Sequence, residues 1–171
     1  LKAAGVKSAL APSLVIEKFE KGWEKEWYHL SHLGMASTYK LYDDQYMAPP
    51  GASMALDVRS AEPNTLVIRL DDAGAEVSLV GGEVWQEVVL QPADFNYSDG
   101  RVRSDWLDIR ELKLSHTDTL RSKGSNKVLK LGRNWKGKGP EIRNLRWEGG
   151  SFVERSKPYV EEAYSQPGES K

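Results

Sequence analysis

Two neighbouring stretches of the chain alternate apolar and polar residues with a period of two. In "SMALDVRS" (53–60) every second residue from Met54 to Val58 is large and apolar, and "TLVIRLD" (65–71) repeats the pattern from Leu66. A strand places successive side chains on opposite faces, so this period predicts two strands that each bury one face. The "AEPN" between them consists of typical turn residues.

Further segments of strand character follow at intervals of roughly 8–12 residues, split by Gly, Pro, Asn and Asp. They are VIEKFEKG (15–22), AEVSLV (75–80), the central part of GEVWQEVVLQPADF (82–95), DIRELKLS (108–115), KVLKLG (127–132) and EIRNLRWEG (141–149). Within 82–95, Val88 and Leu90 are predicted core residues. Helical periodicity is weak and strand–helix units are absent, so the predicted fold is an all-β antiparallel sandwich.

The length and the terminal segments bound the domain. The chain has 171 residues, which favours one domain with tails. Residues 1–13 are interpreted as a linker or processed N-terminal segment, 14–153 as the β-sandwich, and 154–171, with two prolines, as a polar tail or linker. Because the chain has no cysteine, a disulfide framework and a cysteine zinc site are excluded.

Charge and hydropathy argue against two classes of partner. The net charge is −1, so no overall field points to nucleic acid, and no run of 18 apolar residues could span a membrane. The charge is nevertheless uneven, because residues 117–146 hold nine Lys/Arg against two Asp/Glu, a net of +7. Such a segment is either a solvated face or a surface that recognises a polyanion.

Four segments in a fixed order carry a family resemblance. VIEKFEKGW, GASMALDVRSAEPNTLVIRLDDAG, WQEVVLQPADF and DWLDIRELKLS follow one another within residues 14–150. In this order the chain resembles the galactose-binding-like jelly rolls, which include many carbohydrate-binding modules of bacterial glycan-degrading enzymes. The same superfamily includes a domain named for an assembly factor of mitochondrial complex I. The resemblance implies that Trp85 of W-x-x-V-x-L packs in or beside the core, and that Phe95, Trp106 and Trp147 are structural too.

Aromatic residues outside the alternating pattern are the candidate ligand contacts. The C–H faces of a pyranose ring are apolar and stack on an aromatic ring, while a few planar polar groups hold its hydroxyl groups. The candidates are Trp23, Trp27, Tyr42 and Trp135, together with Tyr28, Tyr39 and Tyr46, joined by Lys136 and Lys138 of the basic loop GRNWKGKG. Arg59 and Arg69 would share one face if their strands paired as a hairpin, either as an ion-pair ladder or as the polar floor of a binding face.

Acidic residues give weaker signals. The adjacent pairs at 43–44 and 71–72 are poor candidates for glycosidase carboxylates, because neighbours on a strand point to opposite faces. The resemblance implies a structural calcium near the first strand, where Glu17 and Glu20 could provide oxygen ligands. The last predicted strand, however, lacks the aspartate expected to complete such a site.

The predicted function is therefore a non-catalytic carbohydrate-binding module, tethered to a larger glycan-active enzyme that is secreted or periplasmic. Its partner would be a polysaccharide or oligosaccharide, with acidic polysaccharides among the candidates. The alternative is a protein-interaction or complex-assembly domain with the same jelly-roll fold. Neither hypothesis assigns the chain an enzymatic activity, nucleic-acid binding or a membrane span.

Overall fold

The structure, a computed structural model, describes residues 13–150, and these residues form strands and short 3₁₀ turns without an α-helix. The strands are β1 (Ser13–Glu17), β2 (Ser37–Thr38), β3 (Ser53–Arg59), β4 (Asn64–Leu70), β5 (Ala73–Leu79), β6 (Trp85–Leu90), β7 (Leu112–Ser115), β8 (Thr117–Arg121), β9 (Val128–Gly132) and β10 (Glu141–Glu148). The turns are η1 (Trp23–Glu26), η2 (Lys40–Tyr42), η3 (Asp44–Tyr46) and η4 (Pro92–Asp94). The predicted segments 1–13 and 154–171 lie outside the described residues, except for Ser13, which begins β1.

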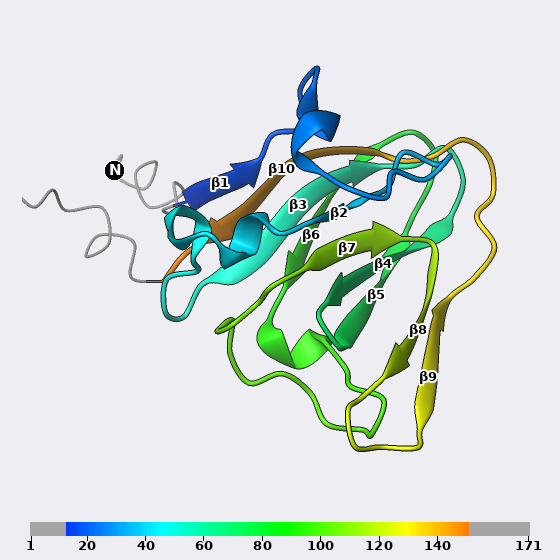
Figure 1. The fold of residues 1–171 in the computed structure, drawn as a ribbon. Coiled ribbons are helices and arrows are strands. Elements are labelled where there is room, and N and C mark those ends of the chain that lie inside the picture. The colour runs from blue at the N-terminus through cyan, green and yellow to red at the C-terminus, as the bar shows by residue number, and fades with distance from the viewer. Residues whose placement is uncertain (1–12, 151–171) are drawn as a thin grey trace, which may run out of the picture.

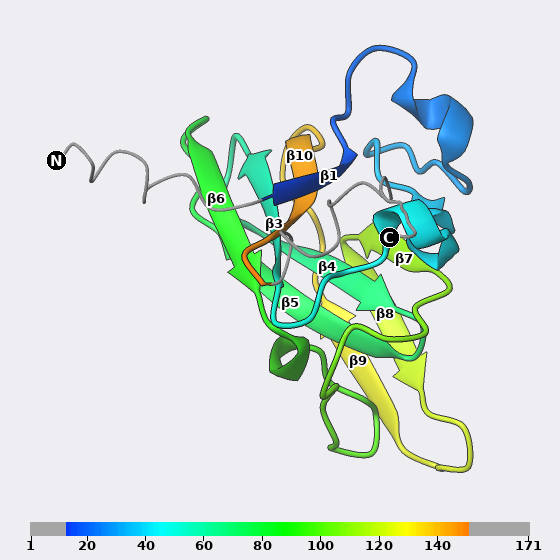
Figure 2. The same cartoon turned by 90° about the vertical axis from the view of Figure 1, so that its left-hand side faces the viewer.

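The strands form two four-stranded antiparallel sheets and one separate hairpin. The first sheet has the order β1-β10-β3-β6, the second has the order β2-β7-β4-β5, and β8 pairs with β9. Figures 1 and 2 show the two sheets lying against each other, with the β8–β9 hairpin at the end of the molecule far from β1. The predicted all-β sandwich is thus confirmed. In the part of the chain that the structure covers, no helix is long and apolar enough to cross a membrane.

The alternating residues of β3 and β4 line the interior, as predicted. Met54, Leu56 and Val58 of β3 are at most 1 % exposed, and the alternate residues of β4 from Leu66 to Leu70 are fully buried. The two strands nevertheless belong to different sheets, since β3 pairs with β10 and β6 whereas β4 pairs with β5 and β7.

The condition under which Arg59 and Arg69 would share a face, a β3–β4 hairpin, is therefore not met, and the two side chains lie on different sheets. Arg59 pairs with Glu141 on the outer face of the first sheet, at 2.6 Å. Arg69 pairs with Glu111 beside the second sheet, at 3.1 Å. The period of two determines which side chains of a strand point inward, but both hairpin pairing and a crossing between sheets satisfy it equally well.

Aromatic rings fill one end of the core. Phe95 and Trp147 are at most 1 % exposed, and Trp106 lies between them, with ring centres 5.7 Å from Phe95 and 5.0 Å from Trp147. Each indole N–H has an acceptor: Trp106 donates to the Ala52 carbonyl and Trp147 to the Tyr46 carbonyl, both at 2.7 Å. The structural role expected of these three rings is confirmed, and their polar atoms are satisfied.

The β8–β9 hairpin covers part of the outer face of the second sheet. Leu120 and Leu131 pack on Val67 of β4 in a small second core. Gly74 of β5 makes this approach possible, because a Cβ atom there would lie 2.6 Å from Leu131 Cδ1. Strand β8, with the sequence TDTLR, was missed by sequence reasoning, because Leu120 is its one large apolar residue and no alternation marks it.

Candidate functional site

A pocket of about 480 Å³ adjoins the outer face of the first sheet. It lies between the segment that follows β1 and the first half of β10. We call it the two-tryptophan pocket. Its walls are Lys18, Phe19, Glu20, Trp23, Gly34, Trp85, Pro140, Glu141, Ile142, Arg143 and Asn144.

The pocket exists because β1 accompanies only half of β10. Strand β1 pairs with Leu145–Glu148, whereas Glu141–Arg143 pair with β3 on their other side. The chain leaves β10 at Phe19, which has a φ of 64°, and β10 itself is irregular at Asn144, which has a φ of 54°. These left-handed conformations are uncommon for non-glycine residues. The edge of β10 over 141–143 therefore faces the pocket instead of another described strand.

Two tryptophans contribute aromatic surface to this pocket. Trp23 of η1 is half-buried and meets Phe19 edge to face, with ring centres 5.0 Å apart. Trp85 lies opposite Arg59 on β3, and the Arg143 guanidinium carbon is 3.9 Å from its ring centre. The expectation that Trp85 packs in or beside the core is wrong, since it belongs neither to the core nor to the side chains packed against it. Because Val88 and Leu90 point inward, the same period of two places Trp85 on the outer face, so this signal was present in the sequence.

The polar groups of the pocket divide into paired and unpaired ones. Glu141 is held by Arg59, and Arg143 lies 3.3 Å from Asp57 Oδ2. Within residues 13–150, the side chains of Lys18, Glu20 and Asn144 have no hydrogen-bond or ion-pair partner. An amide, an ammonium and a carboxylate are thus available beside two indole rings. Sequence reasoning missed Arg143, Asn144 and Lys18 because no pattern in the sequence links them to Trp23.

Trp27, four residues after Trp23, points into the protein. It is 7 % exposed, and its indole N–H donates to Glu17 Oε1 at 2.8 Å. Glu17 also accepts from the Phe19 backbone N–H and forms an ion pair with Lys40 at 3.1 Å. Trp27 therefore offers no ring face to a ligand and instead anchors β1 to η1.

The hydrogen bonds and charges around the Glu17–Lys40 pair shift the pKa values of both side chains. Burial alone would raise the pKa of the Glu17 carboxyl, but hydrogen bonds from Phe19, Trp27 and Lys40 outweigh it and lower the pKa below its ordinary value. For Lys40, burial alone would lower the pKa, but the bonds to Glu26 and Glu17 raise it. Each partner is thus held in its charged form.

The residues around Glu17 do not fit the calcium site that the resemblance implies. Calcium takes six to eight oxygen ligands, but the Lys40 ammonium already occupies the cation position beside Glu17. Glu20 is exposed, and across residues 13–150 no group of three His, Cys, Asp or Glu side chains could hold a metal ion.

Replacing Glu17 tests this arrangement. Glu17→Gln is expected to lower the free energy of unfolding by about 1–3 kcal/mol at pH 7, since hydrogen bonds to a charged group are lost. A carboxyl with a lowered folded-state pKa stabilises above its unfolded pKa and loses that contribution as pH falls through the folded value. The gap to wild type should therefore shrink below about pH 4.3, the ordinary glutamate value. Urea unfolding at pH 7 and pH 3 measures it, with exposed Glu20→Gln as the control. A gap of equal size at both pH values would contradict the assigned role.

The loop that holds Trp135 is braced from within. Trp135 is half-buried against the core, and its indole N–H donates to the Lys138 carbonyl at 2.8 Å. The Asn64 amide binds the Lys136 backbone N–H and carbonyl at 2.8 and 2.9 Å, and Lys138 forms an ion pair with Glu83 at 3.0 Å. Trp135 thus closes the loop, which leads directly into the Pro140 wall of the pocket.

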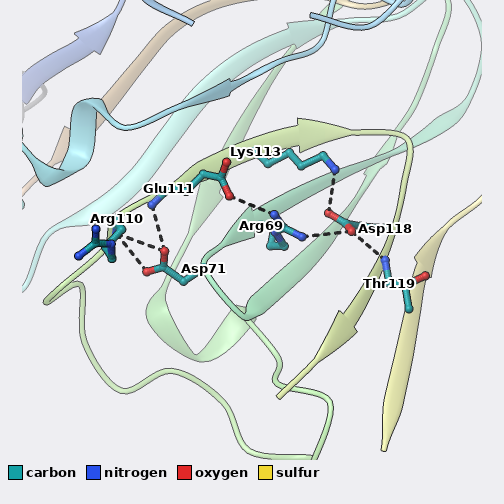
Figure 3. Close-up of polar contacts among 7 residues, drawn as sticks. All are labelled: Arg69, Asp71, Arg110, Glu111, Lys113, Asp118 and Thr119. Atoms are coloured by element: carbon teal, nitrogen blue, oxygen red, sulfur yellow. Dashed lines mark hydrogen bonds and ion pairs between the residues drawn. The ribbon is translucent and has the colours of Figure 1, made fainter. Parts of the chain in front are cut away.

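Arg69 lies in a separate polar cluster on the second sheet, shown in Figure 3. Its guanidinium contacts Glu111 at 3.1 Å and Asp118 at 3.3 Å, and Lys113 lies 3.7 Å from Asp118. Asp71 accepts from the Glu111 backbone N–H at 3.0 Å. Arg69 is thus matched by two carboxylates and ties the β8–β9 hairpin to the sheet. It is not available as the predicted ligand group.

Tyr42 lines a second, more apolar pocket of about 400 Å³, which we call the Tyr42 pocket. Its floor includes Trp106 and Trp147 of the core. Three large apolar side chains on its wall, Tyr42, Met47 and Leu107, are 42–61 % exposed. The Arg110 guanidinium carbon lies 4.8 Å from the Tyr42 ring centre.

The structure thus distributes the predicted site residues over several places. Trp23 and Trp85 both line the two-tryptophan pocket, Arg59 lies against Trp85, and Tyr42 lines a different pocket. Trp27 and Arg69 serve internal contacts. Comparison with models of protein families, with curated proteins and with solved structures found no match.

Proposed function

We propose that this β-sandwich is a non-catalytic carbohydrate-binding module of the galactose-binding-like type, and that its ligand site is the two-tryptophan pocket. The observation that carries the proposal is the convergence of Trp23 and Trp85 on one open pocket with unpaired polar side chains. Its volume of about 480 Å³ lies within the range of roughly 300–1,000 Å³ usual for small-ligand sites. One or two sugar rings are the ligand of matching size.

The chemistry of the walls suits a sugar. An indole ring accepts the apolar C–H face of a pyranose, and burial of that face excludes water from both surfaces. The Asn144 amide offers a donor and an acceptor for hydroxyl groups, while Lys18 donates and Glu20 accepts. Glu141, already bound to Arg59 at 2.6 Å, can accept further hydrogen bonds from hydroxyl groups through its carboxylate oxygens.

Such a module works by tethering. Attached to a secreted or periplasmic glycan-active enzyme, it would hold that enzyme at its substrate and raise the local concentration of the catalytic domain. No metal is needed for this function.

Removing the two rings tests the proposal. Trp23→Ala and Trp85→Ala are each expected to weaken binding at least tenfold, because a buried aromatic contact contributes about 2 kcal/mol or more and 1.4 kcal/mol is tenfold. Affinity electrophoresis against a panel of neutral and acidic polysaccharides identifies the ligand, and calorimetry gives its Kd. The matched control is Tyr39→Ala, an exposed ring outside the pocket that packs on Tyr28. Wild-type affinity in both tryptophan variants would place the site elsewhere.

One observation favours a protein partner instead. The exposed Tyr42, Met47 and Leu107 around the Tyr42 pocket form the kind of aromatic and methionine surface that is enriched in protein interfaces. If no polysaccharide binds, this protein-interaction function replaces the carbohydrate-binding one. Tyr42→Ala with Leu107→Ser should then abolish the association with the flanking or partner protein, while Trp85→Ala leaves it intact.

A further inference from the structure

Within residues 13–150, five exposed cations without an ion-pair partner lie together on or next to the β8–β9 hairpin. They are Arg121, Lys123, Lys127, Lys130 and Arg133. The remaining cations of the basic segment differ: Lys138, Arg143 and Arg146 are paired with carboxylates, and Lys136 lies in the Trp135 loop.

The register of the hairpin presents these cations outward. Leu120 faces Leu129 and Asp118 faces Leu131, and these residues lie toward the second sheet. The alternate positions, including Arg121 and Lys130, therefore point to solvent. Lys123 and Lys127 occupy the turn that joins the strands. The result is one outward surface of cations, interspersed with small polar side chains.

Within residues 13–150, the acids near the hairpin form no ion pair with these five cations. Asp118 is the one acid in residues 117–133, and it binds Arg69 and Lys113 on the inner side (Figure 3). Glu76 accepts from the Gly132 backbone N–H at 2.7 Å, and Asp99 pairs with Arg101 at 2.8 Å.

The hairpin is also fixed in place. Leu120 and Leu131 pack on Val67, and Ser98 and Ser122 exchange hydrogen bonds of 3.0 and 2.8 Å at the start of the turn. A surface held in this way loses little conformational freedom when it binds.

We propose that the outward face and turn of the β8–β9 hairpin form a second binding surface, specific for a polysaccharide that carries carboxylate or sulfate groups. Cations spaced along a hairpin match anions repeated along a chain, and Thr117, Thr119, Ser125 and Asn126 lie beside them to bind hydroxyl groups. Residues 117–133 contain no aromatic ring, so the surface lacks the stacking platform that single-stranded nucleic acids use. The surface lies away from the two-tryptophan pocket and functions whether or not that pocket binds sugar.

Charge reversal tests this surface. Lys123→Glu with Lys127→Glu is expected to weaken binding to heparin and to polygalacturonate at least tenfold at 0.1 M salt. Wild-type binding should itself collapse at 1 M salt, where the screening length falls from about 10 Å to about 3 Å. Arg121→Glu with Lys130→Glu is an independent second variant, and circular dichroism confirms that both variants fold. The matched control, Lys21→Glu with Lys25→Glu, changes the charge equally at η1 and should bind within twofold of wild type.

Two comparisons test whether this surface is independent of the two-tryptophan pocket and whether it prefers acidic polysaccharides to other polyanions. The Trp85→Ala variant should still bind heparin. If it does not, the hairpin surface is not separate from the two-tryptophan pocket. Equal binding to duplex DNA, or to vesicles with 30 % phosphatidylserine, would also overturn the assignment to acidic polysaccharides. Wild-type affinity for heparin and polygalacturonate in both hairpin variants would overturn the proposed binding surface. Failure of the pocket to bind any neutral sugar bears only on the proposed function.

Discussion

Trp147→Ala is expected to lower the free energy of unfolding by about 3–5 kcal/mol, the usual cost of truncating a buried aromatic ring. Trp147 is 1 % exposed on β10, beside Met54 of β3 and against the Trp106 ring. Its removal leaves a cavity between the sheets. It also leaves the Tyr46 carbonyl, which accepts the indole N–H, without its hydrogen-bond donor.

Urea unfolding of the variant and of wild type measures this loss. Trp85→Ala is the matched control, since the same ring is removed from the outer face of the same sheet, and about 1 kcal/mol or less is expected there because the ring is only half-buried. Equal losses in the two variants would mean that Trp85 also supports the core, contrary to its position.

Arg146→Met is expected to lower the free energy of unfolding by about 3 kcal/mol, the lower end of the cost of breaking a buried ion pair. Arg146 is 9 % exposed although it lies on the outer face of the first sheet. It contacts Asp57 at 3.3 Å and both Glu87 and Glu148 at 2.6 Å. Burial alone would lower the pKa of its guanidinium, but Glu148 and Asp57 outweigh it and raise the pKa. Without this cation, three carboxylates would repel one another on adjacent strands.

Arg143→Met provides the comparison for this prediction. Arg143 also pairs with Asp57, at 3.3 Å, but its side chain is 48 % exposed. Exposed pairs contribute about 0–1 kcal/mol, so its loss should be small. Thermal unfolding of both variants distinguishes the two positions, and a Tm for Arg146→Met within one degree of wild type would show that solvent compensates the three acids.

Part of the site was accessible from the sequence. The lack of core periodicity around Trp23 predicts a ligand contact, and Trp23 does line the pocket. The same lack of periodicity around Trp27 makes the same prediction, yet Trp27 is buried. The difference depends on Glu17, ten residues earlier in the chain, which accepts the Trp27 indole N–H. No local pattern reveals such a contact.

The basic segment (residues 117–146) likewise combines a property of the sequence with one that depends on tertiary contacts. Its net charge of +7 is a property of the sequence, but pairing decides which cations remain available. Arg143 and Arg146 meet carboxylates on β3 and β6, whereas the cations of the β8–β9 hairpin have no partner within residues 13–150.

The sequence by itself determined the strands with clear alternation and the faces that they bury, because the period of a strand is a local property of the backbone. The inward positions of β3 and β4, and the outward position of Trp85 relative to Val88, follow from it. Only the tertiary structure decided that β3 and β4 lie in opposite sheets, that β1 leaves β10 halfway, and that Trp85 and Trp23 line one pocket. These facts depend on contacts between segments far apart in the chain, and several pairings of the same strands would bury the same apolar faces.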